Sequence, residues 1–178
     1  KTQVTDIYCV DWPASWHETQ HLDVYANINF DLPFRSDCFD TIVMTDVLEH
    51  VRKPENLLRE IFRVLSPNGK VIISCPFYYW IHESPHDYYR YTEFKFRDFA
   101  EQFGFIVLNI AAYGGPLEII GDTLSKLFCA KKLYRLNALL IKLVKLASKV
   151  RKIREFSLDR AKDFPIGYVV IFQKGAAA

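Results

Sequence analysis

The stretch that most constrains the fold runs from residue 39 to residue 77. FDTIVM at 39–44 is a continuous apolar run, which is typical of a strand buried on both faces, and KVIISCPF at 70–77 is a second strand candidate. Between them, apolar side chains recur at helical spacing over 54–65, and Ser-Pro-Asn-Gly follows as a stop signal. A strand, a helix and a second strand in this order predict a mostly parallel sheet covered by helices.

The remainder of the chain continues the alternation. Further strands are expected at 6–12, 22–28, 105–113 and 164–174, and a helix at 92–103, with Thr92 as its N-cap and Gly104 at its end. Helical sequence fills 116–154. We therefore expect one domain over 1–178, an α/β fold with a Rossmann-like, mostly parallel sheet and helices on both faces. Residues 116–155 would be a basic helical insertion or lid before the last strand.

Cysteine and charge patterns narrow the class of protein. The four cysteines lie far apart without a CxxC pair, and no long uninterrupted apolar run or signal peptide is present, so a cytoplasmic location is expected. The net charge of +2 indicates no polyanionic partner. The distribution is uneven, however, because residues 126–154 carry lysines and arginines and no acid.

Several polar side chains follow the expected strands. Ligands of parallel α/β sheets bind beyond the carboxyl ends of the strands. Asp11, Asn27, the segment TDVLEHV at 45–51 and the loop 76–86 would all lie there. If TDVLEHV turns helical at once, Asp46, Glu49 and His50 share one face.

Residues 32–77, LPFRSDCFDTIVMTDVLEHVRKPENLLREIFRVLSPNGKVIISCPF, resemble the central part of class I S-adenosylmethionine-dependent methyltransferases, type 11 in particular. The order LPF, FD before an apolar strand, LEHV, RVL and a proline-glycine turn carries the resemblance. HESPHDYYRYT at 82–92 is similar to a bacterial subgroup often linked to cell-surface polysaccharide genes.

The resemblance implies S-adenosylmethionine as cofactor and assigns residues to it. Asp11 would hold the ribose hydroxyls, Asn27 and Ile28 would lie near the adenine, and Thr45 and Asp46 would line the methionine part. A solvated loop acid is the alternative for Asp11. The family also opens with a strand and a glycine-rich turn, which this sequence lacks before residue 6. The expectation is therefore an N-terminally truncated fold, either a fragment or a variant without that turn.

The histidines support two chemical hypotheses. His86 or His50 could act as general base in O-methylation, with Asp87 as an orienting group for His86. Alternatively, Asp46, Glu49 and His50 with His86 or His82 could bind a divalent metal ion, because metal-dependent RNA 2′-O-methyltransferases carry a similar E-x-x-E-H. The simpler alternatives are that Glu49 and His50 brace the loop and that tyrosines of 88–91 fix His86.

Two further segments have a structural and a functional interpretation. The aromatic residues of 77–80 and 87–91 could form an acceptor pocket or pack the loop against the sheet, and Arg90 could bind an acidic acceptor or pair with an acid. In 136–153 an apolar stripe and a lysine stripe predict an amphipathic helix. It is either a lid with solvated lysines or a helix that lies on an anionic membrane, at the inner membrane face. Nucleic acid is the weakest partner for this segment.

The sequence thus predicts an S-adenosylmethionine-dependent methyltransferase acting on an oxygen of a saccharide-type, glycolipid or other small acceptor. One alternative is a metal-dependent RNA 2′-O-methyltransferase. Another is a non-catalytic domain that keeps the fold for binding, which the missing glycine turn favours and the retained Asp11 disfavours.

Overall fold

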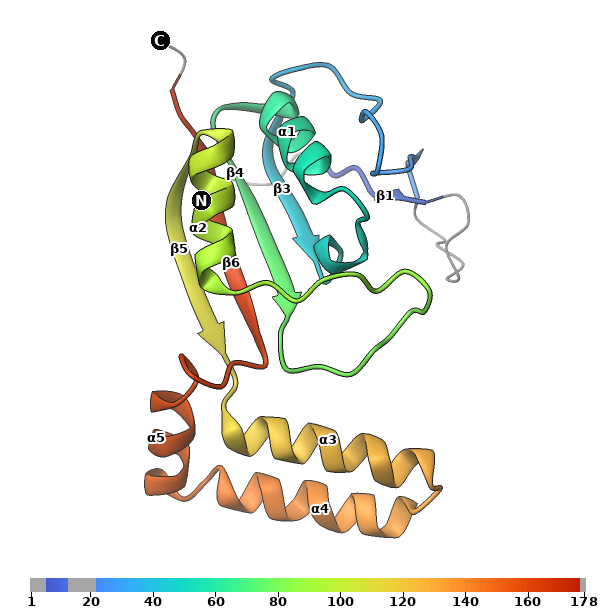
Figure 1. The fold of residues 1–178 in the computed structure, drawn as a ribbon, viewed down its shortest axis with the longest axis vertical. Helices are drawn as coiled ribbons and strands as arrows, with labels where there is room; N and C mark the ends of the chain where they lie inside the picture. The colour runs from blue at the N-terminus through green and yellow to red at the C-terminus, as the bar shows by residue number, and fades with distance from the viewer. Residues whose placement is uncertain (1–5, 13–21, 177–178) are drawn as a thin grey trace.

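The computed structural model describes residues 6–12 and 22–176 (Figure 1). Its strands are β1 (Val10–Asp11), β2 (Val24–Tyr25), β3 (Phe39–Thr45), β4 (Leu65–Pro76), β5 (Phe105–Tyr113) and β6 (Gly167–Lys174). Its helices are the short 3-10 helix η1 (Leu48–His50), α1 (Pro54–Val64), α2 (Glu93–Phe103), α3 (Pro116–Ala130), α4 (Tyr134–Ala147) and α5 (Arg151–Asp159).

The main sheet has the strand order β3-β4-β6-β5. β3 and β4 are parallel and joined by the crossover helix α1, whereas β6 runs antiparallel between β4 and β5. β1 and β2 form a separate parallel pair. This arrangement confirms the predicted α/β class with a Rossmann-like sheet. It also places the loops after β1, β2, β3 and β4 at one edge of the fold.

The core lies between the sheet and the two helices α1 and α2, which cover the same face (Figure 1). Alternate residues of β4, Val71, Ile73 and Cys75, are fully buried there. Phe96 and Phe99 of α2 are buried against the same face, and each large side chain taken out of water contributes roughly 1.5–3 kcal/mol. Period-two burial in the strands and the apolar stripes of α1 and α2 thus produce one core.

The opposite face of β3 is more open than the sequence suggested. The run 39–44 was expected to be buried on both faces, and this is wrong, because Val43 is 63% exposed. Met44 is buried on the helix side, but in the described part of the chain no helix covers Val43. The apolar run alone could not reveal which faces tertiary packing would cover.

Capping and stop signals in the sequence predicted where helices α1 and α2 begin or end. The side chain of Thr92 accepts a hydrogen bond from the backbone N–H of Lys95, and Gly104 takes a left-handed conformation with φ of 78°, so both predicted ends of α2 are confirmed. The expected stop at Ser-Pro-Asn-Gly ends α1 at Val64, but these residues then form an irregular part of β4 where the register with β3 shifts. At Gly69 a Cβ atom would lie 2.7 Å from the Ser66 carbonyl oxygen, so glycine is required there.

Helices α3, α4 and α5 form the insertion between β5 and β6 and lie beyond the sheet, at the end where β3 and β4 finish (Figure 1). α3 and α4 pack closely at Gly121, where a Cβ atom would be 3.1 Å from a Val144 methyl carbon. The hydroxyl of Ser157 on α5 donates to Glu118 of α3 at 2.6 Å. α4 has no buried residue, and among the described residues no helix is long and apolar enough to cross a membrane.

Candidate functional site

A cavity of about 540 Å³ opens at the carboxyl ends of β1, β2 and β3. Its volume lies in the range of small-molecule sites. Most predicted site residues line it: Asp11, Asn27, Ile28, Asp46, His50 and His86. Thr45 ends β3 but is not among the lining residues, and Glu49 lies behind the wall rather than on it. The topology therefore gathers residues that are up to 75 positions apart in the sequence, from Asp11 to His86.

The first wall of the cavity comes from β1 and β2. Among the described residues, the carboxylate of Asp11 accepts one hydrogen bond, from the backbone N–H of its neighbour Trp12 at 2.6 Å. The side-chain oxygen of Asn27 accepts from the backbone and side-chain amides of Asn29, and Asn29 in turn accepts from the backbone N–H of Arg52. Asp11 thus keeps acceptor capacity toward the cavity, while Asn27 also shapes its own turn.

Asp46 follows β3 in a left-handed backbone conformation with φ of 52°. Its carboxylate accepts a hydrogen bond from the Ser74 hydroxyl of β4 at 3.0 Å, and its backbone N–H donates to the Ser74 carbonyl oxygen. A positive φ is costly for a non-glycine residue and indicates a position held by its surroundings. Asp46 therefore does not join Glu49 and His50 on one helical face.

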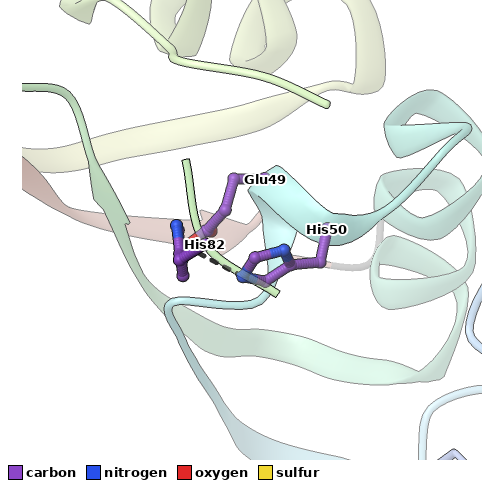
Figure 2. Close-up of side chains that lie close together, drawn as sticks. All are labelled: Glu49, His50 and His82. Carbon is purple, nitrogen blue, oxygen red and sulfur yellow. Dashed lines mark ion pairs between the residues drawn. The ribbon is translucent and has the colours of Figure 1, made fainter. Parts of the chain in front are cut away.

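The next turn, η1, carries a buried carboxylate. The Glu49 side chain is 0% exposed, and neither of its oxygens has a hydrogen-bond partner in the described structure. Burial raises the pKa of Glu49 to about 7, because desolvation disfavours the charged form. Nε2 of His50 lies 3.7 Å and Nε2 of His82 lies 3.8 Å from Glu49 Oε1 (Figure 2).

Two hydrogen bonds orient the imidazoles of this cluster, which we call the Glu49–His50–His82 cluster. Nδ1 of His50 is 2.6 Å from the backbone carbonyl oxygen of His86. Nδ1 of His82 is 3.3 Å from the backbone carbonyl oxygen of Trp80, and an Asp87 carboxylate oxygen lies at the same distance. Both hydrogen-bond partners are carbonyl oxygens, which can only accept, so Nδ1 of each ring carries the hydrogen. Nε2 of each neutral ring then has no hydrogen and lies within 3.8 Å of Glu49 Oε1.

The loop between β4 and α2 is firmly attached to η1. The backbone carbonyl of Glu49 accepts from the N–H groups of Tyr88 and Tyr89. Within the loop, Arg90 donates two hydrogen bonds to Asp87, and this guanidinium holds the pKa of Asp87 well below its usual range. Arg90 thus pairs with an acid, as one of the two interpretations predicted, and is not free for an acceptor.

The side chain of His86 lines the cavity, whereas its backbone carbonyl oxygen contacts Nδ1 of His50. Its Nδ1 is 3.0 Å from the Tyr88 hydroxyl, and its ring packs edge-on against Trp12 with centroids 5.2 Å apart. Asp87 was expected to orient His86, but its carboxylate contacts His82 instead. Of the expected metal ligands, Glu49 and His50 come together with His82, while Asp46 and His86 lie outside the cluster.

A second cavity of about 340 Å³ lies between the loop after β4 and helix α3. Tyr78, Tyr79 and Trp80 line one side, and Lys126 of α3 lines the other. The Lys126 ammonium lies 3.4 Å from the centroid of the Tyr79 ring and 5.4 Å from that of Trp80. The sequence indicates the aromatic residues but not their partner, because Trp80 and Lys126 lie 46 positions apart and no local pattern connects them.

Comparison with solved structures defines the class of fold. The S-adenosylmethionine-dependent methyltransferase from Mesorhizobium loti superposes with a TM-score of 0.54 at 13% identity, over 94% of this chain and 80% of that chain. The [4+2]-cyclase SpnF superposes with a TM-score of 0.52 at 16% identity, over 89% of this chain and 58% of that chain. At such identities the likeness shows the fold, which is the Rossmann-like fold of class I methyltransferases.

The N-terminal part of the chain is also similar in sequence to methyltransferases. Residues 5–73 match the family model described as "Methyltransferase domain". A demethylmenaquinone methyltransferase from Streptomyces griseus is 41% identical over 46 residues, which are 26% of this chain and 20% of that protein. The match thus spans about a fifth of that relative's length. Residues 5–73 are thus similar to a methyltransferase domain, which agrees with the resemblance of residues 32–77 to class I S-adenosylmethionine-dependent methyltransferases.

Proposed function

We propose that this domain transfers a methyl group from S-adenosylmethionine to an oxygen atom of a small, polar acceptor. The observation that carries the proposal is the 540 Å³ cavity, which brings Asp11, Asn27 and Asp46 to one side and two histidines to the other. Carboxylate and amide oxygens suit the hydroxyl and amino groups of a nucleoside and the ammonium group of methionine. The match of residues 5–73 to the methyltransferase family model gives the cofactor class its independent support.

The residues have separate roles in this proposal. Asp11 would accept from the ribose hydroxyls, Asn27 and Ile28 would contact the adenine, and Asp46, after Thr45, would line the methionine end. Bound S-adenosylmethionine supplies an electrophilic methyl group on its sulfonium. The acceptor O–H must lose its proton as the oxygen–methyl bond forms and the sulfur–methyl bond breaks. His86 is the proposed base because its ring lines the cavity, and His50 is the second candidate.

The second cavity supports a saccharide-type acceptor. Sugars present apolar faces that stack on aromatic rings and hydroxyls that bond to polar tips, and Tyr79 and Trp80 offer both. The ammonium of Lys126 lies over these rings and could donate to a sugar oxygen or a phosphate. The relative from Streptomyces griseus is named for a menaquinone precursor, so a quinol belongs in the acceptor panel as a comparison.

A direct assay tests the proposed activity. The chain is incubated with S-adenosylmethionine and panels of saccharides, glycolipids and quinols, and S-adenosylhomocysteine is measured. Acceptor-dependent product that falls in Asp11→Ala and in His86→Ala supports the proposal. Binding of S-adenosylhomocysteine without turnover of any acceptor class would favour the non-catalytic alternative. No binding at all would contradict the cofactor assignment.

We also propose that the insertion contacts an anionic membrane. Leu136, Leu139 and Leu143 of α4 are exposed, Lys142 and Lys145 lie on the same helix, Lys149 and Lys152 follow it, and residues 126–154 hold no acid. An exposed apolar stripe with a cationic border is the pattern of helices that lie in the interface plane, and each basic residue near such a surface adds about 1 kcal/mol. A membrane-bound location would suit a lipid-linked saccharide acceptor.

A further inference from the structure

The Glu49–His50–His82 cluster has an energetic cost that no hydrogen bond to the Glu49 carboxylate offsets in the described structure. Burying a carboxylate without hydrogen bonds costs several kcal/mol, and both Glu49 oxygens are without partners. Nε2 of His50 is likewise buried and without a partner. The distances of 3.7 and 3.8 Å from Glu49 to the two imidazoles are too long for hydrogen bonds.

The orientation of the two imidazoles is that of metal ligands. Each Nδ1–H donates to a backbone carbonyl, that of His86 for His50 and that of Trp80 for His82, and an Asp87 carboxylate oxygen lies 3.3 Å from the same His82 nitrogen. Each Nε2 therefore carries a lone pair and lies within 3.8 Å of Glu49 Oε1; Figure 2 shows the three side chains close together. A histidine that ligates a metal almost always donates its other N–H to a carbonyl or carboxylate in this way.

The spacing of the cluster also fits one ion. The three candidate ligand atoms lie within 4.8 Å of one another. Ligands about 2.1 Å from a common tetrahedral ion are roughly 3.4 Å apart, so only a small movement of the side chains is needed. Glu83 could supply a fourth ligand, since its Oε2 is 4.0 Å from His50 Nε2 and its side chain is half exposed.

We propose that Glu49, His50 and His82 bind one divalent transition-metal ion of the zinc type, with Glu83 or water completing the coordination. Two imidazole nitrogens and one or two carboxylates match Zn²⁺ and its neighbours, whereas Mg²⁺ prefers oxygen ligands and retains several waters. The ion would lie behind the cavity wall that His50 forms. Binding of the ion does not depend on the proposed methyl transfer, because neither cofactor nor acceptor takes part.

Calorimetric titration of the chelator-treated 178-residue chain with ZnCl₂ tests the proposal, with MgCl₂ as a parallel titrant. We expect one equivalent of Zn²⁺ and much weaker binding of Mg²⁺. Removing a partner that only orients a ligand already costs about 10- to 100-fold in affinity, so Glu49→Gln and His82→Gln should each weaken Zn²⁺ binding by about 100-fold or more. Replacing Zn²⁺ by Co²⁺ should give visible absorption that both variants lose.

His86→Gln is the matched control. It removes an imidazole next to the cluster but keeps the backbone carbonyl that orients His50. Zn²⁺ should bind this variant as it binds the unaltered chain, and it should raise the thermal unfolding midpoint of both. The proposal is overturned if no stoichiometric binding occurs, if Glu49→Gln and His82→Gln bind as well as the unaltered chain, or if His86→Gln loses binding to the same degree as they do.

Discussion

Nδ1 of His50 lies 2.6 Å from the backbone carbonyl oxygen of His86, so that the loop after β4 orients a side chain of the turn after β3. Backbone hydrogen bonds from Tyr88 and Tyr89 to the Glu49 carbonyl reinforce this attachment. The two histidines proposed for proton transfer thus belong to one connected unit. Their positions with respect to the cavity depend on the loop 77–91 as a whole.

The His86 side chain should affect kcat more than the binding of S-adenosylmethionine. If His86 removes the acceptor proton, His86→Ala should lower kcat by about 100-fold or more and leave the KM for S-adenosylmethionine nearly unchanged. Steady-state assays with the best acceptor measure both constants. His86→Asn, which keeps a polar side chain of lower basicity, should be equally slow, and full activity in either variant would exclude His86 as the base.

Asp11 should determine the affinity for the nucleoside. Hydrogen bonds to a charged group contribute about 1.5–3 kcal/mol, so Asp11→Ala should weaken binding of S-adenosylhomocysteine by about 10- to 150-fold. Isothermal titration calorimetry measures this difference. Asp40→Ala removes an exposed acid at the other end of β3 and should bind normally. Equal affinities of the two variants would remove Asp11 from the site.

The ion pair of Glu60 and Arg63 should make stability depend on pH. Arg63 holds the pKa of Glu60 below its ordinary value, and Glu60 also accepts the Leu32 N–H at 2.8 Å. Because the pKa is lower in the folded state, this contribution is complete above the ordinary glutamate pKa of 4.5 and is lost as the pH falls through the folded value.

Urea unfolding should therefore show that Glu60→Gln is less stable than the unaltered chain by about 1.5 kcal/mol at pH 7, with a smaller difference below pH 4.5. Glu101→Gln, a change at an exposed position of α2, is the control and should have little effect at either pH. A deficit of Glu60→Gln that is the same at both pH values would show that charge is not its origin.

The insertion should bind anionic vesicles through its lysines. Flotation with phosphatidylglycerol-containing liposomes should recover the chain, and replacing Lys142, Lys145 and Lys149 by glutamine should remove about 3 kcal/mol of electrostatic attraction at low salt. Glutamine substitutions of Lys70 and Lys95, which lie outside the insertion, form the control. Recovery with neutral vesicles alone, or none with anionic ones, would contradict the proposal.

The contribution of the α2 N-cap to the free energy of unfolding should be measurable with a single substitution. Thr92→Ala removes the acceptor of the Lys95 N–H and should lower the free energy of unfolding by about 1 kcal/mol. Thr92→Ser retains the hydroxyl and should be close to neutral. Denaturant unfolding of both variants compares them, and equal losses would mean that the methyl group of Thr92 and not the cap is important.

Local patterns in the sequence determined the elements. The apolar run before Asp46, the helical spacing of 54–65, and Thr92 with Gly104 predicted β3, α1 and α2, because hydrophobic periodicity and capping act over a few residues. The sequence also identified Asp11, Asn27, Asp46, His50 and His86 as residues near strand ends, and all of them line one cavity. The carboxyl ends of parallel strands share one edge, so this gathering follows from topology.

Tertiary structure alone decided which side chains meet. In the folded chain Val43 is exposed, and Glu49 is buried without a hydrogen-bond partner. Asp87 contacts His82 and not His86, and the ammonium of Lys126 lies over the Tyr79 ring. Each of these outcomes depends on how a loop or an insertion packs against residues far away in the chain. Periodicity and motif spacing carry no information about such contacts, because the contacts are selected by the balance of burial and hydrogen bonding in the whole fold.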